Sequence, residues 1–236
     1  MEYQEFEKMF LMELKKNHLE KVNNIEIFYQ YMKLLLEWND KINLTAITEE
    51  KEFIQKHFID SLTIQHFIKE NMKVIDVGTG AGFPGVPLKL VYPELEITLI
   101  DSIGKKVNVL KDVIYHLNLR KIEAIHTRAE DYAKEHRGIY DIAVSRAVAN
   151  MNTLVEYLIP FVKVGGIILC MKGPSIEEEL ESSKKAIDIL GGRIETIENF
   201  FIDEEIERNI VVIKKIKETP IQYPRGQGKP LKEPIK

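Results

Sequence analysis

The spacing of hydrophobic and polar positions changes near residue 72, and this change divides the chain into two kinds of structure. Before it, apolar side chains recur every three or four residues, as at Ile27, Tyr31 and Leu34. That spacing places them on one face of an α-helix. We therefore predict that residues 1–70 form an N-terminal helical extension.

After this point, short apolar runs alternate with segments of helical period. The expected strands are Met72–Val77, Ile97–Asp101, Ile122–His126, Ile139–Ser145 and Gly166–Met171. Helical patterns separate them, notably over Ile103–Leu117 and Thr153–Val162. Alternation of strands and helices is typical of βαβ units, in which neighbouring strands run parallel.

The segment after these strands predicts one more helix. Ser175 and Glu178 have the spacing of a capping box, in which a hydroxyl and a carboxylate satisfy the first backbone N–H groups. The helix is expected to run to Leu190 and to stop at Gly191. Glycine is favoured directly after a helix because it adopts the left-handed conformation that ends it.

Two further strand patterns, Arg193–Phe201 and Asn209–Ile216, follow without a helix between them, joined by the acidic linker Asp203–Glu205. Strands joined in this way are expected to pair antiparallel and to close an otherwise parallel sheet. The chain is therefore predicted to be an α/β protein with a mixed seven-stranded sheet. Residues 71–216 would form its core and residues 217–236 a basic, Pro-rich C-terminal tail.

Composition limits the class of protein. A chain of 236 residues with 44% hydrophobic and 30% charged residues is ordinary for a globular protein. The acidic start, Met1–Glu5, is not expected to be a signal peptide, and no run of about 18 apolar residues suggests a membrane span. The single cysteine, Cys170, lies in an apolar run and is expected in the core, which fits a reducing cytosol. We therefore expect a cytoplasmic protein.

Charge is distributed unevenly along the chain. The formal net charge of −4 argues against wholesale coating of nucleic acid. Residues 214–236, however, carry seven basic and two acidic side chains, which gives this segment +5 and the remainder −9. The asymmetry predicts an anionic partner at the tail, with a solvated terminus as the alternative.

The stretch from Ile75 to Gly85 indicates which cofactor the protein binds. A dinucleotide loop has the pattern G-x-G-x-x-G, and a start at Gly78 places Phe83 where its last glycine should be. The pattern acid-x-Gly-x-Gly-x-Gly of a methyl-donor loop fits from Asp76 without adjustment. The loop therefore favours S-adenosylmethionine, held by the backbone of Gly78 and Gly80. Asp76 is placed to meet its methionine ammonium.

Further candidate residues follow the next three strand patterns. Asp101 can accept hydrogen bonds from both hydroxyls of an adenosine ribose, or can cap the helix that follows it. Ala129 and Glu130 lie where the adenine amino group would be recognised. Arg146 could pair with a carboxylate of the donor or with an RNA phosphate. Ordinary surface salt bridges are the alternative for Glu130 and Arg146.

Several motifs, in this order, closely resemble those of the bacterial small-subunit ribosomal RNA guanine-N7 methyltransferases, also known as the glucose-inhibited division protein B family. The motifs are Asn43–Ala46, Lys56–Leu62, Asp76–Gly85, Asp101–Ser102 with Lys105–Lys106, Arg128–Glu130, Ser145–Ala147, Lys172–Gly173 and Arg225–Pro230. They span most of the chain. The most specific are the Asp-Ser-Leu block at 60–62 and the Gly-Phe-Pro-Gly loop at 82–85.

The resemblance implies a class I, Rossmann-like S-adenosylmethionine methyltransferase with an N-terminal helical extension. It implies methyl transfer to N7 of one guanine, at the guanine-527-type position of 16S rRNA in the small ribosomal subunit. The positions that match the family's donor-binding residues are Gly78, Phe83, Ala129, Glu130 and Arg146, and Asp76, Gly80 and Asp101 complete the candidate cofactor site. We expect the protein to act as a monomer.

The chemistry of this reaction explains why the sequence offers no convincing acid–base pair. Guanine N7 carries a free lone pair, so its attack on the methyl group needs alignment and charge stabilisation rather than deprotonation. We therefore expect no catalytic acid or base and no metal ion, and we expect His57 to be structural. Asp60 and Ser61 could cap a helix or bind a ligand. The candidates for holding RNA are Arg146, Lys172, Arg225 and Lys229.

Two other functions stay open from the sequence. An NAD-dependent oxidoreductase would use a similar glycine loop and the same ribose-binding acid. A non-catalytic ribosome-assembly factor could retain a vestigial donor pocket. Both alternatives make different predictions about which cofactor stabilises the protein and whether a methyl group is transferred.

Overall fold

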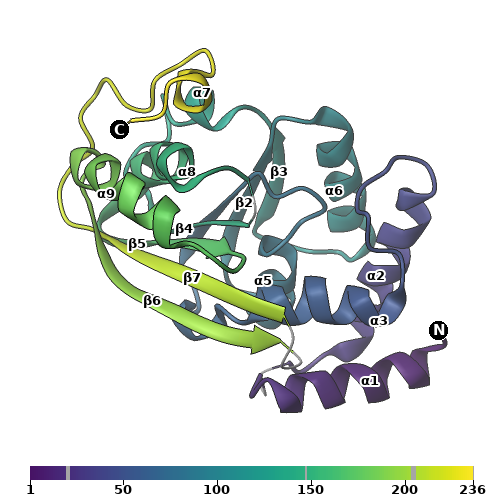
Figure 1. Cartoon of the computed structure of the whole chain (residues 1–236). Coiled ribbons are helices and arrows are strands. Elements are labelled where there is room, and N and C mark those ends of the chain that lie inside the picture. Colours follow the sequence, from purple (N-terminus) through teal and green to yellow (C-terminus); the bar gives the residue numbers. More distant parts are fainter. Residues whose placement is uncertain (20–21, 147, 203–205, 236) are drawn as a thin grey trace.

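A mixed seven-stranded sheet lies at the centre of the protein, with its strands in the order β3-β2-β1-β4-β5-β7-β6 (Figure 1). The computed structural model describes residues 1–19, 22–146, 148–202 and 206–235. The strands are β1 (Lys73–Val77), β2 (Glu96–Asp101), β3 (Ile122–His126), β4 (Tyr140–Arg146), β5 (Val162–Lys172), β6 (Gly192–Ile202) and β7 (Ile206–Lys215). The first five pair in parallel, and β7 pairs antiparallel with both β5 and β6.

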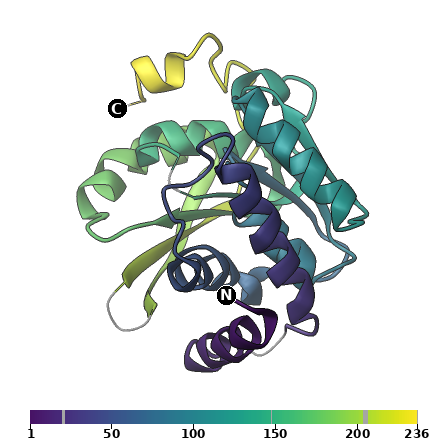
Figure 2. The same ribbon diagram turned by 90° about the vertical axis from the view of Figure 1, so that its right-hand side faces the viewer.

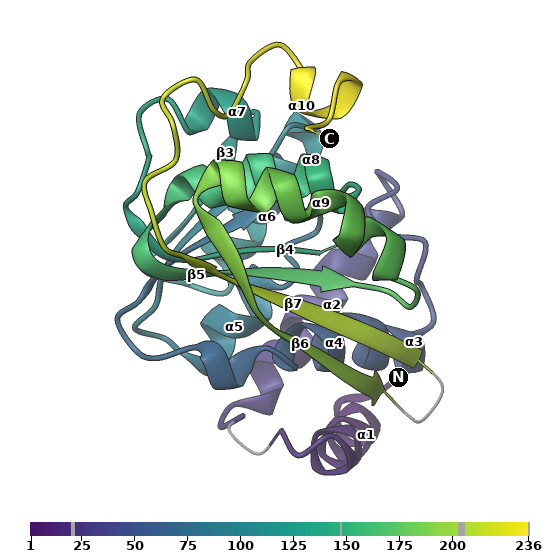
Figure 3. The same cartoon turned by 60° about the vertical axis from the view of Figure 1, so that its left-hand side comes forward.

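Helices cover both faces of this sheet. The α-helices are α1 (Tyr3–Lys16), α2 (Ile25–Asn39), α3 (Glu50–Phe53), α4 (Asp60–Leu62), α5 (Gly85–Val91), α6 (Gly104–His116), α7 (Ala129–Tyr132), α8 (Met151–Leu158), α9 (Glu177–Leu190) and α10 (Lys229–Lys232). A π-helix, η1 (Ile54–Ile59), joins α3 to α4, and two short 3₁₀ helices are η2 (Gln65–Phe67) and η3 (Ile159–Phe161). The N-terminal helices, α5 and α6 lie on one face, and α7, α8 and α9 lie on the other (Figures 2 and 3).

The alternation of side chains along the strands builds two apolar cores. In β1, Val74 packs with the N-terminal helices, α5 and α6, whereas Ile75 packs with α8 and α9. Successive side chains of a strand point to opposite faces, so a strand that is covered on both sides is apolar throughout. The apolar run before the glycine loop therefore follows from its central place in the sheet.

The N-terminal helices share the first of these cores. Phe6, Phe10, Phe28 and Phe58 are fully buried, and the ring centroid of Phe58 lies 5.2 Å from that of Phe28 and 5.7 Å from that of Phe10. The same cluster contains apolar residues from the sheet. The helical extension predicted for residues 1–70 is thus present as helices packed on the core, and its treatment as a separate unit remains a proposal.

The predicted seven strands are confirmed, each within a few residues of its expected bounds. The predicted capping box is wrong: Ser175 has a φ of 60°, Ile176 stands at the N-cap, and no side chain caps α9. The left-handed φ of Ser175 turns its hydroxyl out of the capping geometry, which needs an extended backbone. The end of the helix at Gly191, with a φ of 93°, agrees with the prediction. The acidic linker lies outside the described residues.

The C-terminal tail packs against α8. Arg225 pairs with Glu156 of α8, and Thr153 Oγ1 donates a hydrogen bond to the carbonyl of Pro230 at 2.9 Å. The last described residue, Ile235, is buried in the second core. The tail thus lies at the end of the sheet where β1, β2 and β4 end, beside α7 (Figure 3). Across the described residues, none of the helices combines the length and the apolar character that crossing a membrane requires.

We predict that Phe58→Ala lowers the free energy of unfolding by about 3–5 kcal/mol, because it leaves a cavity in a tightly packed aromatic core. If the N-terminal helices and the sheet form one cooperative unit, the variant should still unfold in a single transition. Urea unfolding followed by Trp38 fluorescence and by far-ultraviolet circular dichroism measures both quantities. Phe201→Ala, at a side chain that is 54% exposed, is the control and should change stability little. Two separate transitions would show an independent extension.

Candidate functional site

The glycine loop, residues 78–85, follows β1. Three of its glycines have backbone angles that other residue types adopt only with strain. Gly78, Gly80 and Gly82 have φ values of 69°, 62° and 103°. A Cβ atom at Gly82 would lie 2.5 Å from Tyr31 Oη, so α2 packs directly on the loop. Tyr31 Oη also donates a 2.6 Å hydrogen bond to the carbonyl of Ala81. The N-terminal extension therefore fixes the loop from one side.

Asp76 holds the loop from within. Its side chain is fully buried, and Oδ2 accepts hydrogen bonds from Thr79 Oγ1 at 2.8 Å and from the Gly85 N–H at 2.9 Å. Oδ1 is buried and has no hydrogen-bond partner among the described residues. Burial raises the pKa of Asp76 to about 6, against the lowering effect of its two hydrogen bonds. A buried carboxylate oxygen without a donor is suited to a cationic ligand.

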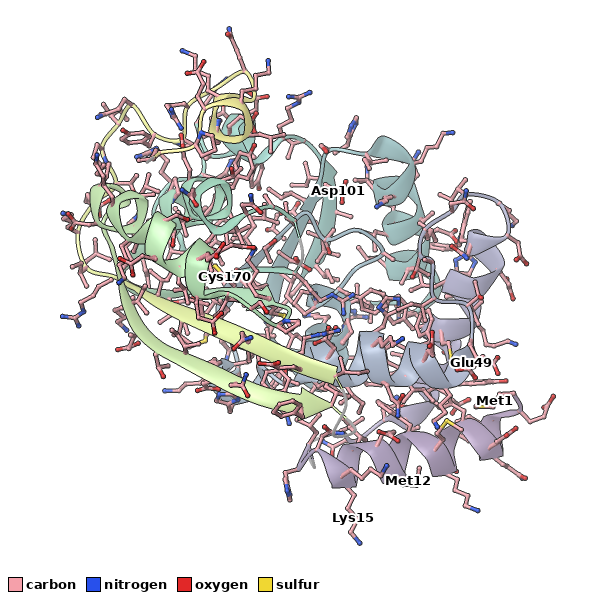
Figure 4. All side chains as sticks on the ribbon, in the orientation of Figure 1. Met1, Met12, Lys15, Glu49, Asp101 and Cys170 are labelled. Carbon is pink, nitrogen blue, oxygen red and sulfur yellow. The ribbon has the colours of Figure 1, made fainter. Side chains whose placement is uncertain are left out.

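Asp101 lies at the end of β2 (Figure 4). Its carboxylate accepts two hydrogen bonds. Its Oδ2 accepts a hydrogen bond from the Gly80 N–H at 2.9 Å, and its Oδ1 accepts one from the Ile103 N–H at 2.8 Å. The second contact is made to the N-cap residue of α6, so Asp101 lies just before the helix and is not itself the N-cap that the alternative predicted. The first ties the glycine loop to β2. Ribose binding by Asp101 remains a prediction.

A cavity of about 270 Å³ brings several predicted residues together at the carboxyl ends of the strands. Its lining comprises Val77, Gly78, Ile100, Asp101, Ser102, Thr127, Arg128, Ala129, Glu130, Val148, Tyr157, Gly228 and Leu231. Open α/β sheets bind nucleotide-like ligands at this edge. A larger cavity, about 500 Å³, lies at the opposite edge, where β2 and β3 begin, and lacks the glycine loop. We therefore assign the smaller cavity as the candidate cofactor site.

The C-terminal tail contributes a wall of this cavity, which sequence reasoning missed. Gly228 and Leu231 line it, and the Gly228 N–H donates a 3.2 Å hydrogen bond to Glu130 Oε1. The only signal in the sequence was the tail motif itself, Arg225–Pro230, which was assigned to RNA. The tail therefore contacts the residue that is expected to recognise adenine.

Phe83 and Arg146 lie in a second group, outside the lining of the cavity. The Phe83 ring stacks on His57 with centroids 4.4 Å apart, and the Arg146 guanidinium lies 5.0 Å from the Phe83 centroid. Arg146 also pairs with Asp60 at 3.0 Å, and Asp60 pairs with Arg208 at 3.1 Å. Cofactor binding by Phe83 and Arg146 remains a prediction, while their present contacts join the glycine loop to the N-terminal helices.

His57 is held as a neutral ring in this group. Burial, and then the charge of Arg146, lowers its pKa to about 3. Arg146 lies 3.1 Å from Nδ1 and can only donate, so Nδ1 accepts and Nε2 carries the proton. Nε2–H then donates to Thr45 Oγ1 at 2.9 Å. The ring thus connects two sequence motifs that lie far apart along the chain.

Of the four candidates for RNA contact, three already form ion pairs within the protein and the fourth is exposed. Arg146 and Arg225 are committed to Asp60 and Glu156, and Lys172 Nζ lies 2.6 Å from Glu179 Oε2. Arg225 makes a two-pronged contact with Glu156, which is fully buried. Lys229 is exposed. Their contact with RNA remains a prediction. No group of three or more metal-ligating side chains occurs among the residues that the structure describes.

Comparison with known proteins identifies relatives over most of the chain. A model of the family described as rRNA small subunit methyltransferase G matches residues 24–211. The protein named Ribosomal RNA small subunit methyltransferase G from Alkaliphilus metalliredigens is 50% identical over 219 residues, which cover 91% of this chain and 92% of that protein. Its namesake from Alkaliphilus oremlandii is 53% identical over 214 residues, 88% of this chain and 89% of that protein.

Solved structures with much lower sequence identity share the fold. TYW2 from M. jannaschii, in complex with AdoMet, superposes with a TM-score of 0.57 at 18% identity. The match covers 72% of this chain and 80% of that protein. A mutant of MtNAS in complex with S-adenosylmethionine gives a TM-score of 0.56 at 14% identity, over 81% of this chain and 75% of that one. The fold is therefore that of class I methyltransferases.

We predict that His57→Gln flattens the loss of stability in acid. The unfolded chain takes up a proton on His57 below its ordinary pKa of 6.5, whereas the folded protein does so only near 3. Stability from this group is therefore fully present above pH 6.5 and is lost as the pH falls toward 3, by about 1.4 kcal/mol per pH unit. Urea unfolding of both proteins at about pH 7, 6 and 5 measures the difference. The exposed His116→Gln variant should follow the wild type; identical slopes for all three would contradict the prediction.

Proposed function

The chain belongs to the rRNA small subunit methyltransferase G family, and we propose that it methylates N7 of a single guanine in 16S rRNA, at the guanine-527-type position. The observation that carries this proposal is the match to the family over residues 24–211, which includes the glycine loop and all the cavity residues except Gly228 and Leu231. The methyl donor is S-adenosylmethionine. We further propose that the protein works in the cytoplasm as a monomer on the small ribosomal subunit.

Residues in the cavity and beneath the glycine loop fit this cofactor. Asp76 does not line the cavity and is fully buried beneath the loop. Its Oδ1, which has no partner among the described residues, is suited to the methionine ammonium, directly or through a water. A Cβ at Gly80 would meet no atom of the described residues within 4 Å, so the backbone of the loop is open on this side to a close ligand. Asp101, Ala129 and Glu130 line the part of the cavity where the ribose and adenine would lie. When bound, S-adenosylmethionine supplies an electrophilic methyl group on a positively charged sulfur.

The proposed reaction asks little acid–base chemistry of the protein. Guanine N7 carries a free lone pair, so no side chain has to remove a proton from the base before it accepts the methyl group. The methylated base would carry a positive charge. The chain's task is to hold N7, carbon and sulfur in line and to keep water out. A loop fixed by Tyr31, Asp76 and Asp101 suits this task because it needs no rearrangement.

The target base must leave its stack to reach the cavity. N7 lies on the major-groove edge, which is deep and narrow in an RNA helix, so an unpaired or splayed guanine is required. We propose that Lys229 contacts RNA phosphate, because its ammonium is exposed on the tail that borders the cavity. Arg225 would instead hold the tail in place through Glu156. Contacts of Arg146 with RNA would require its pairing with Asp60 to change.

The alternatives are disfavoured. A nicotinamide oxidoreductase needs a glycine near the position of Phe83, and this ring is packed between Tyr31 and His57. A non-catalytic assembly factor with a vestigial donor pocket would differ from the enzyme in transferring no methyl group. Thermal stabilisation by S-adenosylhomocysteine but not by NAD would separate the enzyme classes. Methyl transfer would separate the enzyme from the assembly factor.

We predict that 16S rRNA from cells lacking this protein has lost one methyl group at a single guanine, and that a plasmid copy of the gene restores it. Mass mapping of nuclease fragments locates the change. The purified protein should also transfer labelled methyl from S-adenosylmethionine to small-subunit particles prepared from those cells. A Gly78→Val variant is the matched inactive control, because a Cβ there would lie 2.4 Å from Val148. An unchanged methylation map would defeat the proposal.

We predict that cofactor affinity falls in acid because Asp76 must be ionised to accept the ligand ammonium. With a pKa of about 6, its carboxylate is ionised above pH 6 and becomes neutral below it. Affinity for S-adenosylhomocysteine should then drop by about tenfold per pH unit below this value. Asp76→Asn should bind weakly and without this pH dependence. Isothermal titration calorimetry measures both, with the exposed Asp188→Asn as control; a pH-independent wild type would contradict the assignment of Asp76.

A further inference from the structure

A second hollow, of about 280 Å³, lies beside the cofactor cavity. It is formed by the segment after β4, the end of β5 and the first turn of α9. Val148 lines both hollows, and its Cγ2 lies 2.4 Å from where a Cβ of Gly78 would be, so it rests on the glycine loop. This hollow therefore adjoins the candidate cofactor cavity at Val148.

Two charged side chains in the hollow have hydrogen-bonding capacity that the protein does not use. Lys172 Nζ donates to the carbonyl of Ala149 at 2.6 Å and to Glu179 Oε2 at 2.6 Å, which leaves one of its three protons. Glu179 Oε2 also accepts from the Met151 N–H at 3.0 Å. Among the described residues, nothing donates a hydrogen bond to Glu179 Oε1. A donor and an acceptor thus lie side by side, with Lys172 only 9% exposed.

We propose that this hollow holds the target guanine, with Lys172 donating to O6 and Glu179 Oε1 accepting from N1–H and the exocyclic amino group. The inference rests on the function proposed above. Around the purine edge, the order of atoms is N7, O6, N1 and the amino nitrogen. In the hollow, the donor Lys172 and the acceptor Glu179 lie side by side, 2.6 Å apart. The neighbouring acceptor O6 and donor N1–H of guanine match this pair.

The same pair rejects adenine. Adenine presents an amino donor where guanine has O6, and this donor would face the Lys172 ammonium. Its N1 carries a lone pair that would face the Glu179 carboxylate. In a partly desolvated site, two donors that face each other, or two acceptors that face each other, make binding less favourable. Adenine would therefore bind more weakly than guanine. Recognition of guanine therefore follows from two side chains, and Lys172 acts on the base rather than on a phosphate.

The pair also suits the charge change of the reaction. The purine becomes positively charged when N7 is methylated. The Glu179 carboxylate offsets the Lys172 ammonium, so the hollow presents no net positive charge to the cationic product. A hydrogen bond from N1–H to an ionised carboxylate strengthens as charge builds on the ring. The N1 proton stays on the base.

The test compares guanine with inosine at the target position, because inosine lacks only the exocyclic amino group. Small-subunit particles are reconstituted with 16S RNA that carries either base. For the wild type, kcat/KM should be about 10-fold higher with guanine. For Glu179→Gln, kcat/KM with guanine should fall about 10- to 100-fold, and the guanine-to-inosine ratio should approach one. The ratio of the affinity for guanine particles to that for inosine particles, measured in the presence of S-adenosylhomocysteine, should also fall toward one in Glu179→Gln.

Glu178→Gln is the matched control, because Glu178 lies one position earlier on α9 and is exposed. It should keep the wild-type rate and ratio. The variant Glu179→Gln retains an amide oxygen for the Met151 N–H, and an unchanged melting temperature and S-adenosylhomocysteine affinity would show that it is folded. A wild-type ratio in folded Glu179→Gln, or no preference in the wild type, overturns the inference alone. Absence of methyl transfer by the wild type to guanine particles overturns the proposed function and the inference with it.

Discussion

The arrangement of the site depends on the ion pairs that the carboxylate of Asp60 makes with two arginines. Asp60 is 2% exposed, belongs to α4, and pairs with Arg146 of β4 and Arg208 of β7. Removal of one partner of a buried ion pair is costly because it strands a charge away from water. The three side chains therefore fix α4 against two strands. The Arg146 guanidinium also lies 5.0 Å from the centroid of the Phe83 ring, so the same ion pair links α4 to the glycine loop.

The glycine loop is consequently held from several directions before any ligand arrives. Tyr31 donates to Ala81 from the N-terminal face, Asp101 accepts from Gly80, and Val148 lies against Gly78. On the far side, the contact of Arg225 with buried Glu156 holds the tail where Gly228 reaches Glu130. The N-terminal segment thus fixes the glycine loop, and the C-terminal segment fixes the wall of the cavity that contains Glu130. Such preorganisation suits a transfer reaction whose barrier depends on alignment.

The sequence predicted the features that local pattern encodes, namely seven strands, the main helices and a methyl-donor loop after β1. It failed where one residue's backbone decided the outcome, as at Ser175, whose φ of 60° removes the expected cap. It could not reveal the partners of Arg146 and Arg225, which lie 86 and 69 positions away along the chain. Opposite charges so far apart carry no local signal. The tail's place beside Glu130 was hidden for the same reason.

The distribution of charge reconciles an acidic protein with a polyanionic substrate and a cationic product. Near the site, three of the candidate cations pair with carboxylates: Arg146 with Asp60, which also pairs with Arg208, Arg225 with Glu156, and Lys172 with Glu179. A hollow lined by unpaired cations would attract RNA but would oppose the positive charge that methylation leaves on guanine. A cation that is paired with a carboxylate can still donate hydrogen bonds, while the electrostatic potential of the pair at the methylated base is small. Attraction of the phosphate backbone can then be left to exposed residues such as Lys229, away from the reacting atoms.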